Sequence, residues 1–361
     1  MRIAQIAPLY ESVPPQAYGG TERVVHYLTE ELVRQGHDVT LFASGDSQTS
    51  AQLVSGCKKA LRLSNACQDP LAHHTILLDK VFSRADDFDI LHFHTDYNHF
   101  PTSRQLHVPT VTTLHGRLDL PDLEPLYNYF DQMPLVSISQ SQRVFLKRVN
   151  WVGNVYHGLP RNHLQNLKSQ PGQHDFLAFV GRISPEKRPD RAIRIAVQAG
   201  MKLKIAAKID AVDRQYFESQ VKPLLDLPGV EFLGEMDEFQ KIELLANASA
   251  YLFPIDWPEP FGLTMIEAMA CGTPTIAFRC GSVPEIIDDG VTGFVVTSED
   301  EAVAALREVK NISRARCRAT FERRFTSCRM ARDYVSIYEA LIDGACLDSL
   351  PRSFEVTTQP S

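Results

Sequence analysis

Short apolar runs alternate with longer amphipathic segments through the first half of the chain. Between the first two runs, residues 21–35 repeat apolar side chains at helical spacing, with Val24, Val25, Leu28 and Leu32 on one face. Alternation of short buried strands with helices is typical of βαβ units, whose strands pair in parallel. The strands predicted here span residues 2–7, 39–42, 90–93, 110–113 and 136–138.

A second series of the same kind follows a polar segment at residues 164–175, which contains Pro171 and Gly172. That composition is typical of a linker. The pattern therefore predicts an α/β protein with two domains, one at residues 1–165 and one at residues 176–312. The strands predicted in the second series span residues 176–180, 203–206, 230–233, 250–253, 275–277 and 293–296, with a helix at residues 189–199.

The end of the chain follows neither series. Residues 313–343 are predicted to be helical, with Tyr334, Ile337, Tyr338 and Leu341 on one face. The final residues, 348–361, are polar and include prolines, which predicts a disordered tail.

Composition narrows the classes of protein to consider. A chain of 361 residues is too long to fold around one ordinary hydrophobic core. Its 44% hydrophobic residues, 22% charged residues and mean hydropathy of -0.17 are typical of a soluble globular chain. A net charge of -7 argues against a general nucleic-acid binder. No apolar run is long enough to span a bilayer, and the run at residues 1–8 is shorter than we expect of a signal peptide. Its 7 scattered cysteines predict reduced thiols, so we expect a cytoplasmic protein.

The most informative segment spans residues 258–274. Pro258 and Pro260 end a predicted strand, and Gly262 precedes a run of good helix formers. Amide groups at a helix start lack partners and carry the positive end of the helix dipole, so a phosphate is a natural ligand there. Glu267 lies one turn into this helix, where its carboxylate can accept hydrogen bonds from two ribose hydroxyls. A single glutamate is more commonly a solvated surface group, and the surrounding prolines and glycines favour the site.

With Glu259, which lies 267 − 259 = 8 positions before Glu267, this segment resembles the Glu-x7-Glu signature of family 4 glycosyltransferases. That family has the GT-B fold of two facing Rossmann-like domains and uses nucleotide-sugar donors with retention of configuration. The resemblance extends over most of the chain. It implies that the C-terminal domain holds the donor, that the N-terminal domain holds the acceptor, and that the terminal helix crosses back to the N-terminal domain.

Two more loops fit the resemblance. Arg182 and Lys187 follow a predicted strand. The guanidinium of Arg182 can bind two phosphate oxygens at once, and the ammonium of Lys187 adds a compact positive charge, which together suit a diphosphate. They match the diphosphate clamp of the family. Gly19 and Gly20 precede the first helix, where backbone can approach a ligand, and they match the glycine pair that touches the donor phosphate. A basic surface loop and a simple turn are the alternative interpretations.

Histidines end two of the predicted strands. The resemblance implies that His115 lies near the donor sugar and forms the catalytic set with Glu259. His92 and His94 share one face of a strand, which is compatible with a metal. We favour a site without metal, in which His94 and Asp96 shape the acceptor pocket.

Two other segments leave alternatives open. Residues 87–89 read Asp-Phe-Asp, the form of the metal-binding motif of the other major glycosyltransferase fold, and we expect them at the edge of the protein. Residues 141–151 combine basic with apolar side chains. We interpret them as a solvated helix face, although a weak peripheral contact with an anionic membrane remains an alternative.

The sequence therefore predicts a retaining, metal-independent glycosyltransferase that moves a sugar to an unidentified saccharide, lipid or small-molecule hydroxyl. It needs no cofactor beyond its co-substrate, a UDP- or GDP-sugar. A sugar-nucleotide epimerase of the same fold, a non-catalytic nucleotide-sugar-binding protein and a nucleotide-dependent oxidoreductase are the alternatives, the last weakened by the lack of a Gly-x-Gly-x-x-Gly fingerprint. The predicted donor-binding residues are Gly19, Gly20, Arg182, Lys187, Glu235, Met236, Phe261, Gly262, Leu263 and Glu267.

Overall fold

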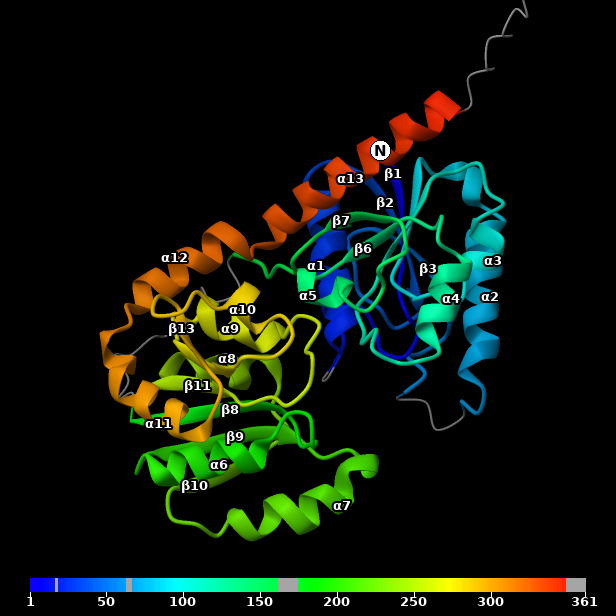
Figure 1. Ribbon diagram of the computed structural model, residues 1–361. Helices are drawn as coiled ribbons and strands as arrows, with labels where there is room; N and C mark the ends of the chain where they lie inside the picture. Colours follow the sequence, from blue (N-terminus) through cyan, green and yellow to red (C-terminus); the bar gives the residue numbers. More distant parts are fainter. Residues whose placement is uncertain (17–18, 63–66, 162–174, 349–361) are drawn as a thin grey trace, which may run out of the picture.

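Two parallel β-sheets, each flanked by helices, form the two halves of the protein (Figure 1). The computed structural model describes residues 1–16, 19–62, 67–161 and 175–348, with side chains up to residue 344. Nearly all of the predicted linker and of the predicted disordered tail lies outside the described residues. The alternating pattern of apolar runs thus correctly predicts the α/β class and the two sheets.

The N-terminal sheet has seven strands, with β1 near its centre. The chain builds outward from β1 in one direction and then restarts on its other side with β4, which makes β1 and β4 the switch point of the sheet. Ligands of such sheets bind outside the carboxyl ends of the strands at this point. In sheet order the strands are β3 (Gln52–Cys57), β2 (Asp38–Ser44), β1 (Arg2–Ile6), β4 (Ile90–Phe93), β5 (Thr110–Thr113), β6 (Leu135–Ser137) and β7 (Trp151–Asn154).

The C-terminal sheet repeats this arrangement with six strands, and its switch point lies between β8 and β11. All of its strand pairs are parallel. In sheet order the strands are β10 (Val230–Gly234), β9 (Lys202–Lys208), β8 (Phe176–Arg182), β11 (Ala250–Phe253), β12 (Thr275–Phe278) and β13 (Gly293–Val296).

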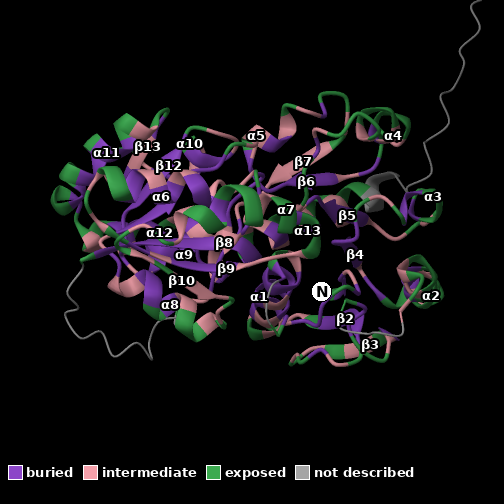
Figure 2. Cartoon of the chain, turned by 90° about the horizontal axis from the view of Figure 1, so that it is seen from below, coloured by how far each residue is buried: buried purple, intermediate pink, exposed green. Residues whose placement is uncertain are grey.

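Helices cover both sheets and turn their apolar faces inward. The first of them buries Val24, Val25, Leu28 and Leu32, the face that the sequence pattern predicts. Figure 2 shows most of the central strands buried, while the outer surfaces of helices such as α2 and α4 are exposed. The helices are α1 (Gly20–Arg34), α2 (Pro70–Phe82), α3 (Phe100–Ser103), α4 (Leu123–Tyr129), α5 (Gln140–Arg143), α6 (Pro189–Gln198), α7 (Arg214–Tyr216), α8 (Glu238–Asn247), α9 (Leu263–Ala270), α10 (Val283–Ile286), α11 (Glu299–Glu308), α12 (Arg314–Arg324) and α13 (Ser327–Asp348).

The last helix leaves the C-terminal half and packs on the N-terminal half (Figure 1). Tyr334 and Tyr338 of α13 are fully buried, and their hydroxyls reach Thr113 of β5 and Gln5 of β1. Gly153 in β7 leaves the space that the side chain of Ile337 occupies. The terminal helix is therefore part of the N-terminal core.

Two edge strands, β3 and β7, were not predicted. Both contain a glycine and are only half-buried, so they lack the apolar run that marks the inner strands. The interpretation of residues 141–151 as a helix is wrong, because α5 ends at Arg143. There the chain turns back, and the indole N–H of Trp151 donates to the carbonyl of Leu146 at 2.9 Å. Among the described residues, no helix is long and apolar enough to cross a membrane.

Candidate functional site

A cleft of about 630 Å³ lies between the two halves, at the carboxyl ends of the strands of both sheets. This is where the strand order of each sheet places a ligand. Every residue that the sequence analysis assigned to the site lines this one cleft, although the chain separates some of them by more than two hundred positions. These residues are Gly19, Gly20, His94, Asp96, His115, Arg182, Lys187, Glu235, Met236, Glu259, Phe261, Gly262, Leu263 and Glu267.

The N-terminus of α9 forms part of the cleft wall. Its cap is Gly262, which has a left-handed backbone with φ of 79° and offers no capping side chain. The first amides of the helix, on Leu263 and Thr264, therefore keep the positive end of the helix dipole available to a ligand. The Thr264 hydroxyl accepts a hydrogen bond from Tyr251 of β11 at 2.7 Å, which ties the helix to the sheet.

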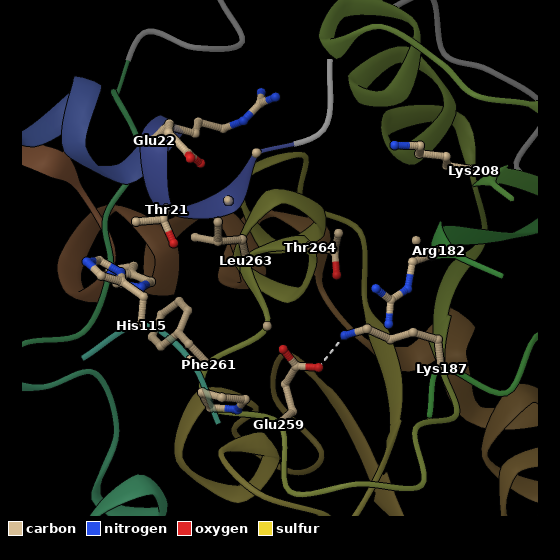
Figure 3. Close-up of a pocket in the computed structure, with 18 of the residues that line it drawn as sticks. Thr21, Glu22, His115, Arg182, Lys187, Lys208, Glu259, Phe261, Leu263 and Thr264 are labelled. Carbon is tan, nitrogen blue, oxygen red and sulfur yellow. Dashed lines mark hydrogen bonds and ion pairs between the residues drawn. The ribbon is translucent and has the colours of Figure 1, made fainter. Parts of the chain in front are cut away.

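The N-terminus of α1 meets that of α9 across the cleft (Figure 3). Gly19 caps α1 without a side-chain hydrogen bond, and a Cβ at Gly20 would lie 3.6 Å from a methyl group of Leu263. A Cβ at Gly19 would lie 2.7 Å from Pro15, so only glycine fits there. Two helix N-termini, one from each half, thus bring positive dipole ends to the same space.

Lys187 and Glu259 form an ion pair at the wall opposite α1 (Figure 3). Only 8% of Glu259 is exposed, and its carboxylate also accepts from the indole N–H of Trp257 at 2.9 Å. The Lys187 ammonium lies 5.5 Å from the ring centre of Phe253 and 5.3 Å from that of Trp257. These aromatic faces and the carboxylate hold the ammonium in place.

Arg182 ends β8 and is surrounded by carboxylates. Its guanidinium nitrogens lie 3.3 Å from Glu186, 3.3 Å from Asp213 and 3.9 Å from Asp210. These partners fix the direction of the guanidinium and offset part of its charge. The attraction of this part of the cleft for an anion therefore depends on the helix N-termini as well as on Arg182 and Lys187.

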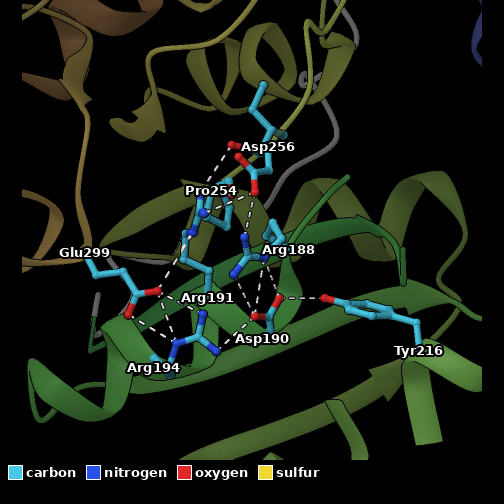
Figure 4. Close-up of polar contacts among 9 residues, drawn as sticks. Arg188, Asp190, Arg191, Arg194, Tyr216, Pro254, Asp256 and Glu299 are labelled. Carbon is cyan, nitrogen blue, oxygen red and sulfur yellow. Dashed lines mark hydrogen bonds and ion pairs between the residues drawn. The ribbon is translucent and has the colours of Figure 1, made fainter. Parts of the chain in front are cut away.

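A second group of charges, behind the cleft, ties together the loops that carry Lys187 and Glu259 (Figure 4). Arg188 binds Asp190 of α6 at 3.0 Å and Asp256, in the loop before Glu259, at 2.7 Å. Its backbone is left-handed, with φ of 52°, which is strained for arginine. The two ion pairs offset this strain, so the loops on either side keep one relative position.

Glu267 lies one turn into α9, and only 4% of it is exposed. One carboxylate oxygen is 2.6 Å from the Nζ of Lys241. The other, Oε2, is buried and has no hydrogen-bond partner among the described residues. A buried carboxylate oxygen without a donor is costly, so this atom is suited to accept from a ligand hydroxyl.

Several residues that line the cleft near Glu267 were not predicted from the sequence. Lys241 and Glu238 both come from α8, and Arg23 of α1 forms an ion pair with Glu238 across the two halves. The signal for α8 was present as a capping box, in which Asp237 and Gln240 bond each other's backbone. A helix that starts just after β10 places its first turn at the cleft, and this reasoning would have found Lys241.

A cluster of histidines forms the wall of the cleft on the N-terminal side. His115 Nε2 is 2.8 Å from His94 Nδ1, and its ring stacks on His157, which in turn contacts Phe261 edge to face. Burial lowers the pKa of His115 to about 3 and holds the pKa of His94 and of His157 well below the usual range. All three imidazoles are therefore neutral at neutral pH.

Three more predicted residues lie at the rim of the cleft. Asp96 follows β4 with a left-handed backbone and remains partly exposed to solvent. Desolvation of its carboxyl by the surrounding protein raises the pKa of this group to about 6. Glu235 and Met236 follow β10, between that strand and α8.

Of the residues with alternative metal interpretations, Asp87, Asp89 and His92 lie outside the cleft, while His94 lines it. Asp89 binds Arg2 at 2.7 Å, at the opposite end of the N-terminal sheet. Both ring nitrogens of His92 are used, one by the Tyr338 hydroxyl and one by Thr113, each at 2.7 Å. Among the residues that the structure describes, no group of three or more His, Cys, Asp or Glu side chains could hold a metal ion.

Gly262→Ala is expected to weaken both the fold and ligand binding. Its Cβ would lie 2.7 Å from Met265 and 3.1 Å from the Phe253 ring, so α9 has to shift in addition to the cost of the positive φ. Gly290→Ala is the matched control, because Gly290 has φ of 71° but no atom within 4 Å of the added Cβ. We expect the Gly262 variant to lose about 1–3 kcal/mol more than the control in denaturant unfolding. Equal losses in the two variants would contradict the packing argument.

Comparison with known proteins gives concordant matches. The family model described as Glycosyl transferases group 1 matches residues 161–322, and the model described as Glycosyltransferase Family 4 matches residues 18–153. An uncharacterised glycosyltransferase of Methanocaldococcus jannaschii is 26% identical over 343 residues, which cover 82% of this chain and 85% of that protein.

Solved structures agree in fold. A glycosyltransferase involved in avilamycin A biosynthesis has a TM-score of 0.71 at 23% identity, covering 95% of this chain and 98% of that one. An Anabaena protein in complex with UDP and glucose has a TM-score of 0.71 at 19% identity, covering 94% of this chain and 100% of that one. At these identities the likeness shows that the folds are shared.

Proposed function

We propose, from the premise that this chain belongs to the family 4 glycosyltransferases and has their GT-B fold, that its cleft moves a sugar from a nucleotide diphosphate sugar to an acceptor hydroxyl with retention of configuration. One observation carries the proposal. Two cations, two helix N-termini and two buried carboxylates from distant parts of the chain line a single cleft.

The diphosphate of the donor is assigned to Arg182, Lys187 and the helix N-termini of α9 and α1. These groups offer donors and positive dipole ends where negative charge develops as the bond between the sugar and the phosphate breaks. We therefore propose that the enzyme acts without a metal, and transfer that survives a chelator at full rate is the expected result. Transfer that stops on chelation and returns with a divalent cation would contradict this part.

The nucleoside is assigned to the C-terminal half. Glu267, with its unpartnered Oε2, is placed to accept from the ribose hydroxyls, and Glu235 and Met236 lie where a base would extend toward the rim. A UDP- or GDP-sugar is the proposed donor. The Anabaena protein of the same fold binds UDP, which supports this nucleotide class.

The sugar is assigned to the centre of the cleft, between Glu259 and His115. The acceptor enters from the side of His94 and Asp96. We propose a front-side reaction, in which the bond from the anomeric carbon to the diphosphate breaks and the acceptor oxygen bonds the same face. The acceptor proton passes to the leaving phosphate oxygen, so no protein nucleophile is needed.

We propose that the reaction takes place in the cytoplasm. The described cysteines, at positions 57, 67, 271, 280, 317 and 328, are free thiols, as expected in a reducing compartment.

A screen of nucleotide sugars tests the proposed function. We expect a UDP- or GDP-sugar to raise the unfolding temperature, since a ligand at 100 times its Kd adds about 2.7 kcal/mol of stability. NMR of the mixture with candidate acceptors should then show a glycoside with the anomeric configuration of the donor. An inverted product, or a donor isomerised without acceptor, would contradict the proposal, and binding without turnover in any acceptor mixture would favour a non-catalytic sensor.

A further inference from the structure

A chain of buried hydrogen bonds connects the cleft with the C-terminal helix. From His115 it passes to His94 Nδ1 at 2.8 Å, from His94 Nε2 to Gln5 Oε1 at 2.9 Å, and from Gln5 Nε2 to the Tyr338 hydroxyl at 3.1 Å. Gln5, His94 and Tyr338 are at most 3% exposed. The chain thus crosses from the end of β5, through β4 and β1, to α13.

The orientation of the Gln5 amide sets the direction of this chain. Its carbonyl oxygen accepts, so His94 carries its proton on Nε2. Because His94 is neutral, its Nδ1 has a lone pair and accepts from His115 Nε2. His115 therefore carries its own proton on Nε2, which leaves Nδ1 as an acceptor.

Tyr338 holds the amide in that orientation. His92 Nδ1 lies 2.7 Å from the Tyr338 hydroxyl and 3.4 Å from the amide nitrogen of Gln5, which can only donate. With Nδ1 of His92 as the acceptor, the hydroxyl of Tyr338 donates to it and keeps a lone pair for the amide N–H of Gln5. If the amide were reversed, two acceptors would face each other unless every proton along the chain moved. The direction of the Tyr338 hydroxyl and the protonated nitrogen of His115 are therefore linked through this chain of hydrogen bonds.

The other nitrogen of His115 is the atom that this arrangement leaves for a ligand. Nδ1 is buried and has no hydrogen-bond partner among the residues that the structure describes. The ring is held by stacking on His157, at 5.2 Å between ring centres. Burial keeps the imidazole neutral, since the pKa of His115 is lowered to about 3. Because His115 lines the cleft, its unused lone pair is suited to a hydroxyl donor.

We propose that Tyr338 and Gln5 are positioning residues of the cleft, which act through His94 to hold His115 in the tautomer protonated on Nε2, so that Nδ1 accepts from a hydroxyl of the bound sugar. The identity of that ligand rests on the proposed function. The hydrogen-bond chain itself does not, and its effect on the tautomer can be measured without any substrate.

Tyr338→Phe tests the proposal, with Tyr334→Phe as the matched control. Both tyrosines are fully buried on α13 and each variant loses one hydroxyl. The hydroxyl of Tyr338 contacts Gln5 directly, whereas that of Tyr334 contacts Thr113 and reaches Gln5 only through Thr113, His92 and Tyr338. In protein labelled with ¹⁵N-histidine, the signals that disappear in His115→Gln identify this residue. We expect wild type and Tyr334→Phe to show a protonated Nε2 and an unprotonated Nδ1, and Tyr338→Phe to show a mixture of tautomers.

Kinetics provide the second measurement. Tyr338→Phe should lower kcat with UDP-glucose or GDP-glucose roughly tenfold, the upper end of what one hydrogen bond contributes, and should leave the Kd for UDP or GDP unchanged. A protonated Nδ1 in wild type, or an unchanged tautomer in Tyr338→Phe, would overturn the proposal. If Tyr338→Phe does not fold, Gln5→Met takes its place. A mixture of His115 tautomers in Gln5→Met would support the proposal, and an unchanged tautomer in Gln5→Met, or a protonated Nδ1 in wild type, would overturn it. If wild type binds neither nucleotide sugar, the proposed function fails, while the spectra still test the chain of hydrogen bonds.

Discussion

Lys187→Met is expected to lower kcat/KM for sugar transfer about 100- to 1000-fold, the loss typical of removing one group that stabilises transition-state charge. Methionine keeps the apolar stem against the rings of Phe253 and Trp257 and removes only the ammonium. The variant should remain folded, because Glu259 keeps the indole N–H of Trp257 as a donor. Steady-state kinetics with the donor found in the nucleotide-sugar screen measure the effect.

Lys204→Met is the control for this variant. Lys204 lies on β9 of the same sheet, outside the cleft, and pairs with Glu231 at 3.5 Å on the surface. Its replacement should leave kcat/KM unchanged. It should change the free energy of unfolding by no more than about 0.5 kcal/mol. A Lys187 variant that retains more than half of the wild-type rate would remove Lys187 from the proposed diphosphate clamp.

Glu267→Gln is expected to weaken the binding of UDP or GDP about 10- to 100-fold. The charged carboxylate is the proposed acceptor for the ribose hydroxyls, and hydrogen bonds to charged groups contribute about 1.5–3 kcal/mol. The glutamine side chain keeps the shape of the site and still offers one oxygen to Lys241, which limits the damage to the fold. Titration calorimetry with each nucleoside diphosphate measures the change.

Glu243→Gln, which removes an exposed carboxylate from α8, is the matched control and should bind nucleotide as wild type does. An unchanged Kd in Glu267→Gln would contradict the assignment of the ribose. A changed Kd in both variants would point to a general effect of charge instead of a contact.

Most inner strands could be predicted from the sequence because they are buried and read as short runs of mainly apolar or β-branched residues, such as Ala250–Phe253 and Thr275–Phe278. The edge strands β3 and β7 could not, since each is half-exposed and mixes a few apolar residues with polar ones and a glycine. The turn of the chain after Arg143 depends on the indole of Trp151 and the carbonyl of Leu146, a contact that no local pattern encodes.

The meeting of the candidate residues in one cleft could be predicted because they stand at the ends of strands and starts of helices. In a parallel sheet these positions converge on one edge, so short motifs that follow different strands meet in one cleft. The partners of those residues could not be predicted in the same way. Gln5 and Tyr338, for example, are separated by 333 positions, and only the packing of α13 on the N-terminal sheet brings them together.

The most direct test of the whole account compares the affinity of the wild-type protein for UDP and GDP with its affinity for UMP and GMP. If Arg182, Lys187 and the two helix N-termini form a diphosphate site, the second phosphate should tighten binding at least about tenfold, or ~1.4 kcal/mol. The double variant Arg182→Met with Lys187→Met should lose that difference. Equal affinity of the wild-type protein for the diphosphates and the monophosphates would contradict the account.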